Sequence, residues 1–171
     1  MNQPNQPDDI DIIVAQWQAQ GLSTDFDALQ ISARILRLEK YLQTHLLKLH
    51  GDFNLKAGEF DVLAALKRAP EPALTPSQLY QAMLLSSGAM TSRLDRLESK
   101  QLIQRQHCKQ DRRSIKVSLT DKGRALIDEA YPQHFSLLQS LFSIMADSDK
   151  AQLSSLLKTC LQHLDAEPGT D

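Results

Sequence analysis

Cationic side chains are concentrated in the stretch QHCKQDRRSIKVSLTDKGRAL, residues 106–126, which holds six Lys or Arg against two Asp. Four of them, Lys109, Arg112, Arg113 and Lys116, lie within eight positions. A guanidinium presents a planar fork of N–H donors that fits phosphate oxygens, and an ammonium presents a point charge to the same oxygens. The cluster therefore indicates a site that binds a polyanion.

The charge of the whole chain is uneven. The 171 residues carry a formal net charge of −2, yet residues 86–118 hold eight Lys or Arg against three Asp or Glu. This segment has an excess of five positive charges, so the rest of the chain carries −7. Such asymmetry favours one basic face for a polyanion and an acidic remainder that discourages indiscriminate binding to nucleic acid or membrane.

The basic stretch lies in a predicted β-hairpin. Residues Leu102 to Arg105 read as a strand, and SIKVSL, from Ser114 to Leu119, alternates polar and apolar side chains with the period of a half-buried strand. The loop between these strands contains Arg112 and Arg113. The hairpin would therefore present its arginines at the tip.

Two short helices are predicted before the hairpin. Thr75 is an N-cap, Pro76 fits the first helical position and Gln78 completes a capping box, so a helix starts here and ends near Leu84. Ser86 then caps a second helix with apolar residues at positions 90, 94 and 97, which share one side. The brief connection predicts a helix-turn-helix.

A helix-turn-helix followed by a basic hairpin is the winged-helix arrangement, in which the second helix occupies the major groove of DNA and arginine at the hairpin tip enters a narrow groove. An acidic residue two positions before Arg113 can fix its guanidinium in one orientation.

Two alternatives stay open for the second helix: its arginines contact phosphates, or they pair with Asp95 and Glu98. The predicted DNA-binding residues are Ser86, Ser87, Thr91, Ser92, Arg93, Arg96, Lys109, Asp111, Arg112, Arg113 and Lys116.

Helices are predicted on both sides of the winged helix, giving a mainly α fold. A short amphipathic helix around Ile10 to Trp17 stops at Gly21, and a longer one, with Thr24 or Asp25 as cap, reaches Gly51. After the hairpin, Thr120 caps a helix that Pro132 should bend or interrupt, and a last helix has a broad apolar stripe. The predicted organisation is a tail (1–7), N-terminal dimerisation helices (8–53), a DNA-binding region (54–119), C-terminal dimerisation helices (120–165) and a second tail (166–171).

Several classes of protein are disfavoured. The two cysteines, Cys108 and Cys160, form no CxxC pair and the five histidines are scattered, so neither a metal nor any other cofactor is expected. The chain has no phosphate-cradling glycine loop, no Gly-x-Ser-x-Gly and no HExxH, which argues against an enzyme. No run of 18 apolar residues and no signal-peptide pattern occurs, so a cytoplasmic location without membrane contact is expected.

The run from Glu59 to Ile127 resembles the MarR family of bacterial transcriptional regulators. The resemblance rests on EFDVLAAL, LTPSQLY, SSGAMTSRLDRLE and the signature DRR-S-x-x-V-x-LT-x-x-G at Asp111 to Gly123. It implies a homodimer with interlocked N- and C-terminal helices and two winged-helix lobes that bind double-stranded DNA. It also implies that Arg113 enters the minor groove and that Asp111 orients the Arg113 side chain. An apolar last helix and the apolar face of residues 10–17 suit such an interface.

A narrower resemblance is to the branch of that family that contains PecS and the urate-responsive regulators, because Gln16 and Trp17 stand before an acidic linker and EFDVL. It implies a site for a purine-like aromatic anion, with Trp17 stacking, Asp61 accepting hydrogen bonds and Arg93 as charged partner. The chain lacks arginine between positions 37 and 68, where urate-responsive members have one close to the aspartate. The effector is therefore either urate or another aromatic acid. Trp17 either contacts this ligand or anchors the core.

The function predicted from these features is sequence-specific repression of transcription from a pseudo-palindromic operator, relieved by a small aromatic anion or an oxidative signal. The rival hypothesis is a winged-helix module that docks a protein partner and binds no operator.

Overall fold

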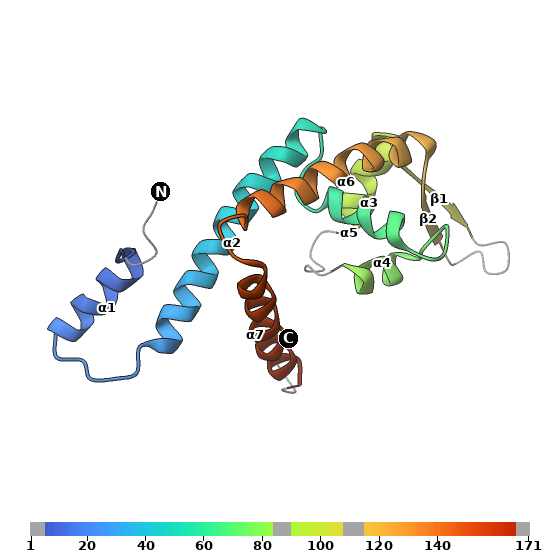
Figure 1. The fold of residues 1–171 in the computed structure, drawn as a ribbon. Helices are drawn as coiled ribbons and strands as arrows, with labels where there is room; N and C mark the ends of the chain where they lie inside the picture. Colours follow the sequence, from blue (N-terminus) through green and yellow to red (C-terminus); the bar gives the residue numbers. More distant parts are fainter. Residues whose placement is uncertain (1–5, 84–89, 108–114, 167–171) are drawn as a thin grey trace. The chain divides into compact units, whose positions relative to one another are not determined.

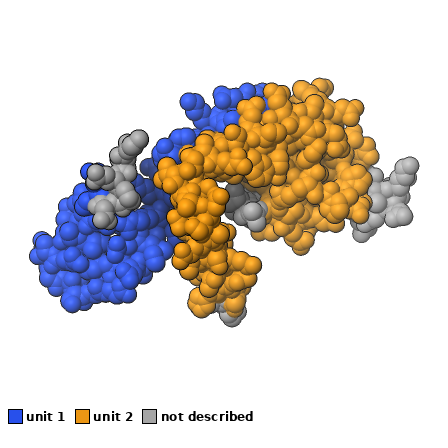
Figure 2. Space-filling model, viewed as in Figure 1, with its two compact units in different colours: residues 1–57 blue, residues 58–171 orange. Residues whose placement is uncertain are grey.

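The computed structural model describes residues 6–83, 90–107 and 115–166. The chain forms two compact units, residues 1–57 and residues 58–171 (Figure 2). The described elements are mainly α-helices with one antiparallel pair of strands (Figure 1), which confirms the predicted fold class.

The first unit contains α1 (Asp9–Ala19) and α2 (Asp27–Asp52). Asp8 caps α1 by accepting from the N–H groups of Ile10 and Asp11, while the Asp11 carboxylate accepts from the Asp8 N–H. Phe26, rather than the predicted Thr24 or Asp25, is the N-cap residue of α2. The Asp25 carboxylate still accepts from the first N–H of the helix, at 2.9 Å, so it acts from one position further out.

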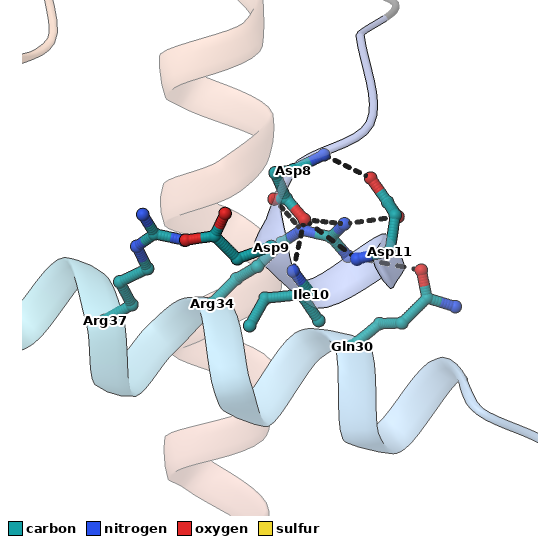
Figure 3. Close-up of polar contacts among 7 residues, drawn as sticks. All are labelled: Asp8, Asp9, Ile10, Asp11, Gln30, Arg34 and Arg37. Carbon is teal, nitrogen blue, oxygen red and sulfur yellow. Dashed lines mark hydrogen bonds and ion pairs between the residues drawn. The ribbon is translucent and has the colours of Figure 1, made fainter. Parts of the chain in front are cut away.

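Ion pairs attach α1 to α2 (Figure 3). Arg34 Nε donates to Asp8 Oδ2 at 2.9 Å and its Nη2 donates to Asp11 Oδ1 at 2.8 Å. One turn along α2, Arg37 pairs with Asp9 at 2.8 Å. Hydrogen bonds from Arg34, aided by the cap N–H groups, lower the pKa of Asp8 to about 2. Asp8 therefore serves two helices at once, as cap of α1 and as anchor on α2.

The core of the second unit is built around α3 (Glu59–Arg68). Its side chains from Phe60 to Leu66 are buried apart from Asp61, so the helix is apolar on nearly all sides. It ends where Ala69 turns extended before Pro70, as predicted. The other buried apolar side chains among the described residues of this unit are Leu74, Leu79, Met83, Leu94, Leu97, Leu102, Ile103, Val117, Leu119, Ile127 and Ala130.

The strands β1 (Ile103–His107) and β2 (Ile115–Leu119) form the predicted hairpin, with Ile103 opposite Leu119 and Arg105 opposite Val117. A further pairing was not predicted from the sequence. Leu74, in the segment between α3 and α4, exchanges two backbone hydrogen bonds with Val117, at 2.9 and 2.7 Å. The strand β2 is thus paired with β1 on one edge and, through Val117, with Leu74 on the other, so the hairpin is tied to the chain ahead of α4.

Two long helices follow the hairpin. Thr120 caps α6 (Asp121–Leu141) by accepting from the Gly123 N–H, as predicted. Pro132 was predicted to bend or interrupt this helix, and the interruption is wrong, because α6 continues through Pro132 to Leu141. A proline removes one backbone hydrogen bond, and α6 remains helical across it while Ile127 and Ala130 are buried on the preceding turns. The last helix, α7 (Asp147–Ala166), buries none of its residues in the single chain.

None of the helices within the described residues has both the length and the apolar character needed to span a membrane.

Candidate nucleic-acid interface

The helix pair that precedes the hairpin is α4 (Pro76–Ala82) and α5 (Met90–Ser99). The Thr75 hydroxyl accepts from the Gln78 N–H at 3.2 Å and the Gln78 side chain accepts from the Thr75 N–H at 2.8 Å, which confirms the predicted capping box. On α5, Leu94 and Leu97 are buried, whereas Thr91 and Ser92 are exposed. The buried leucines therefore fix which side of α5 faces outward, and that side carries hydroxyl groups suited to base edges and phosphates.

The hairpin is fixed to α5 by Arg105 of β1. Its Nη2 lies 2.6 Å from Asp95 Oδ1 and its Nε lies 3.5 Å from Glu98 Oε2. Asp95 and Glu98 therefore pair with Arg105 rather than, as one of the two alternatives predicted, with the arginines of α5 itself. On β2, Val117 is buried and Lys116 is exposed, as the alternation of SIKVSL predicts.

The structure describes five of the predicted DNA-binding residues. Thr91, Ser92, Arg93 and Arg96 lie on α5, and Lys116 lies on β2. The other predicted contacts lie outside the described residues: Ser86, Ser87, Lys109, Asp111, Arg112 and Arg113.

Where the hairpin meets α6, the backbones approach closely at Gly123. A Cβ atom built on Gly123 would lie 1.9 Å from the carbonyl oxygen of Leu102. That oxygen accepts from the Thr120 N–H at 3.1 Å, and the Thr120 hydroxyl donates to Gln101 O at 2.7 Å. Only glycine leaves room for this contact, which sets the hairpin against the start of α6.

Sequence reasoning missed the role of Glu59, the first residue of α3. Its side chain is fully buried, with Arg96 Nε 2.7 Å from Oε1 and Lys100 Nζ 2.6 Å from Oε2. Arg96 also donates to the Ser92 hydroxyl. No local pattern signals this contact, because the partners are 37 and 41 residues apart in sequence. A glutamate opening a helix is ordinarily an exposed acid near the helix dipole.

The structure brings two of the three predicted ligand residues, Asp61 and Arg93, near each other. Burial raises the pKa of Asp61, while the charge of Arg93 acts in the opposite direction. The Arg93 guanidinium lies over Gly58, where a Cβ would be 2.3 Å from Arg93 Cζ, and Gly58 has a φ of 75°. Arg93 Nη1 is buried and has no hydrogen-bond acceptor among the described residues. This donor could serve an anion. The third residue, Trp17, belongs to α1 of the other unit and is half exposed.

An imidazole lies beside this pair. The His134 ring of α6 stacks on Phe60, with centroids 4.5 Å apart. Burial lowers the pKa of His134 and the negative charge of Asp61 partly offsets this effect. The folded protein therefore favours neutral His134, and this residue contributes stability above the unfolded pKa of about 6.5 that is lost as the pH falls. The contribution of Asp61 to stability changes with pH in the opposite direction, because its raised pKa favours the folded state at low pH.

We expect the free energy of unfolding to fall between pH 7 and pH 5, and to fall less in His134→Phe, which keeps a ring against Phe60 and removes the titration. Urea unfolding at several pH values measures the difference. His163→Gln, on the exposed end of α7, keeps His134 and should retain the wild-type pH dependence. If the free energy of unfolding falls equally with pH in wild type and His134→Phe, the titration of His134 does not contribute to the pH dependence.

A helix-turn-helix with an attached antiparallel hairpin defines the class of winged-helix DNA-binding proteins. Comparison with known proteins agrees. The family model described as MarR family matches residues 53–114. PecS, an HTH-type transcriptional regulator of Dickeya dadantii, is 33% identical over 89% of this chain and 92% of its own. The transcriptional repressor YetL of Bacillus subtilis is 27% identical over 64% of this chain and 66% of its own.

A solved structure shares both the fold and part of the sequence. A mutant of MarR from Escherichia coli, in complex with operator DNA, superposes with a TM-score of 0.68 and 27% identity, covering 81% of this chain and 99% of its own. The chain belongs to the MarR family and is a DNA-binding transcriptional regulator. The relatives compared are named as regulators of transcription rather than as enzymes. In the part of the chain that the structure describes, no group of three or more His, Cys, Asp or Glu could hold a metal ion.

Proposed function

We propose that the protein is a homodimeric repressor in the cytoplasm that binds a pseudo-palindromic operator and is released by a small aromatic anion or an oxidative signal. The observation that carries the DNA-binding part is the exposed hydroxyl face of α5, held beside a basic hairpin. In this proposal Thr91 and Ser92, with Ser86 and Ser87 ahead of them, contact base edges or nearby phosphates. Lys116 contacts phosphates, as does the hairpin tip with Lys109 and Arg112, and Arg93 contacts either a phosphate or the ligand. Arg113 enters the minor groove, oriented by Asp111.

An apolar surface supports the homodimer. Between α6 and α7 lies an open groove of about 840 Å³. Its apolar lining consists of Phe135, Leu138, Phe142, Met145, Leu153, Leu157 and Leu161. Leu156 and Leu164 of α7 are also well exposed. So large an apolar surface is costly to leave in water, and a second copy of the chain would cover it. A two-fold dimer would present two α5 helices to half-sites about one turn of DNA apart, or a multiple of that.

The half-buried Asp61 and Arg93 support the ligand part. Arg93 Nη1 offers a donor that no described residue uses, and Asp61 offers an acceptor whose raised pKa reflects a desolvated position. An aromatic acid or a urate-like anion presents the matching carboxylate or ring oxygens and N–H groups. Since Arg93 is on α5, an anion held here would act directly on the helix proposed to read DNA. It would release the operator by binding one arrangement of the helices better than the other.

We expect Arg113→Ala to weaken binding to DNA upstream of the regulator's own gene by about 10- to 100-fold, the loss typical of one specific contact. Lys116→Ala should weaken binding to all DNA sequences. It should also reduce the salt slope, the steepness with which the logarithm of the binding constant falls with the logarithm of salt concentration, by about 0.9, the value for one phosphate contact. Fluorescence-anisotropy titrations at several salt concentrations measure both effects. Lys48→Ala, which removes an exposed charge on α2, is the matched control and should leave the slope unchanged.

A wild-type protein that binds no DNA at any salt concentration would remove the proposal and favour the rival hypothesis of a protein-docking module. In that case Arg113→Ala would leave partner binding nearly unchanged.

A further inference from the structure

The structure assigns Glu59 a positioning role that sets DNA specificity: it holds Arg96 and Lys100 against α3, so that neither cation contacts phosphate. This inference rests on the proposed function, because it concerns how α5 meets DNA. It also changes the role of Arg96, which the sequence pattern placed among the DNA contacts.

The geometry is that of one carboxylate shared by two cations, one in the last turn of α5 and one directly after that helix. Arg96 and Lys100 are four residues apart, and the Lys100 N–H donates to Arg96 O at 3.1 Å, so the two side chains lie on one side and each can reach a separate oxygen of Glu59. The carboxylate is fully buried, whereas the side chains of Arg96 and Lys100 are 32% and 22% exposed. A buried carboxylate without partners is strongly unfavourable, so Glu59 requires these cations. The pairing therefore fixes α5 on α3.

The same pairing extends to a residue predicted to read bases. Arg96 Nη1 donates to the Ser92 hydroxyl while its Nε is held by Glu59. Glu59 therefore fixes Arg96, and Arg96 orients the Ser92 oxygen on the exposed side of α5. Ser92 keeps acceptor and donor capacity for DNA, since a hydroxyl has one donor and two lone pairs.

The effect on recognition follows from the kinds of contact that α5 makes. Phosphate contacts raise affinity for every sequence, whereas base contacts distinguish sequences. By withdrawing two cations from the phosphates, Glu59 lowers the sequence-independent part of binding. By orienting Ser92, it preserves the sequence-dependent part. Both effects raise the ratio of operator to non-specific affinity.

The test compares Glu59→Gln with wild type for binding to operator DNA and to unrelated DNA over a range of salt. The amide keeps the size of the side chain but loses its charge, and it places an NH₂ group toward Arg96 or Lys100. We expect tighter binding to unrelated DNA, a salt slope steeper by about 0.9 for each released cation, and an operator preference reduced about tenfold. Glu129→Gln, an exposed residue of α6, makes the same change in net charge and should behave as wild type.

A second variant is independent of whether Glu59→Gln folds well. Lys100→Gln removes a cation that the inference keeps away from phosphate, so the salt slope should match wild type. A slope smaller by about 0.9 would show that Lys100 contacts phosphate and would overturn the inference. Unchanged slope and operator preference in a folded Glu59→Gln would also overturn it. A wild-type protein that binds no DNA would instead remove the proposed function, and this inference with it.

Discussion

Gly123→Ala is expected to destabilise the protein by about 3 kcal/mol, at the upper end of the range for overpacking. The added Cβ would lie 1.9 Å from the Leu102 carbonyl oxygen and 2.8 Å from its carbon. Both atoms belong to the backbone, so a rotamer change cannot relieve the clash. Either α6 must shift away from the hairpin, or the hydrogen bond from the Thr120 N–H to Leu102 O must lengthen. For a chain of this length the loss corresponds to about 6–12 °C in melting temperature, measurable by circular dichroism.

Gly51→Ala is the matched control. Gly51 lies in α2, and a Cβ there would meet no atom within 4 Å. Alanine favours helix over glycine by about 1 kcal/mol at most, so this variant should be as stable as wild type or slightly more so. Equal melting temperatures for the two variants would show that the contact at Gly123 adapts at little cost.

Leu161→Asp is expected to convert a dimer into a monomer and to weaken operator binding at least 100-fold. Leu161 lines the groove between α6 and α7 and is 59% exposed in the single chain. A carboxylate there costs the isolated chain little, but it would be desolvated without a partner once a second copy covers the groove. Without the dimer, each half-site binds separately, and the gain from linking two binding events, typically 10²- to 10⁴-fold, is lost.

Analytical ultracentrifugation measures the change in mass, and the operator titration measures the change in affinity. Ser155→Asp introduces the same charge at an exposed position of α7 that is not part of the groove lining. It should remain a dimer with wild-type affinity. If Leu161→Asp also remains a dimer, this face of α7 does not form the interface.

The parts of the fold that were predictable from the sequence depend on neighbours in the chain. The capping box of Thr75 and Gln78 joins residues three positions apart, and the alternation in SIKVSL reports directly which side of β2 is buried. A cap or a strand period is satisfied within a few residues, so composition and spacing reveal it. The continuation of α6 through Pro132 was not predictable in this way, because burial of Ile127 and Ala130 on the preceding turns outweighs one missing hydrogen bond.

The candidate site was only partly predictable for the same reason. The nearness of Asp61 and Arg93 followed from a family resemblance and agrees with the structure. The bond between Glu59 and Lys100 joins α3 to the end of α5, and no periodicity connects positions 41 residues apart. Sequence patterns identify which helix face is buried, whereas the pairing of a buried charge depends on how two helices pack.

The backbone pairing between Leu74 and Val117 gives the hairpin a mechanical role. Because β2 is paired with β1 on one edge and, through Val117, with Leu74 on the other, the base of the hairpin cannot pivot without pulling on the segment that leads into α4. Arg105 joins the same hairpin to α5 through Asp95. The helix pair and the hairpin are therefore expected to move as one rigid body rather than as two parts joined by a hinge. A displacement of the hairpin would move α4 and α5 with it.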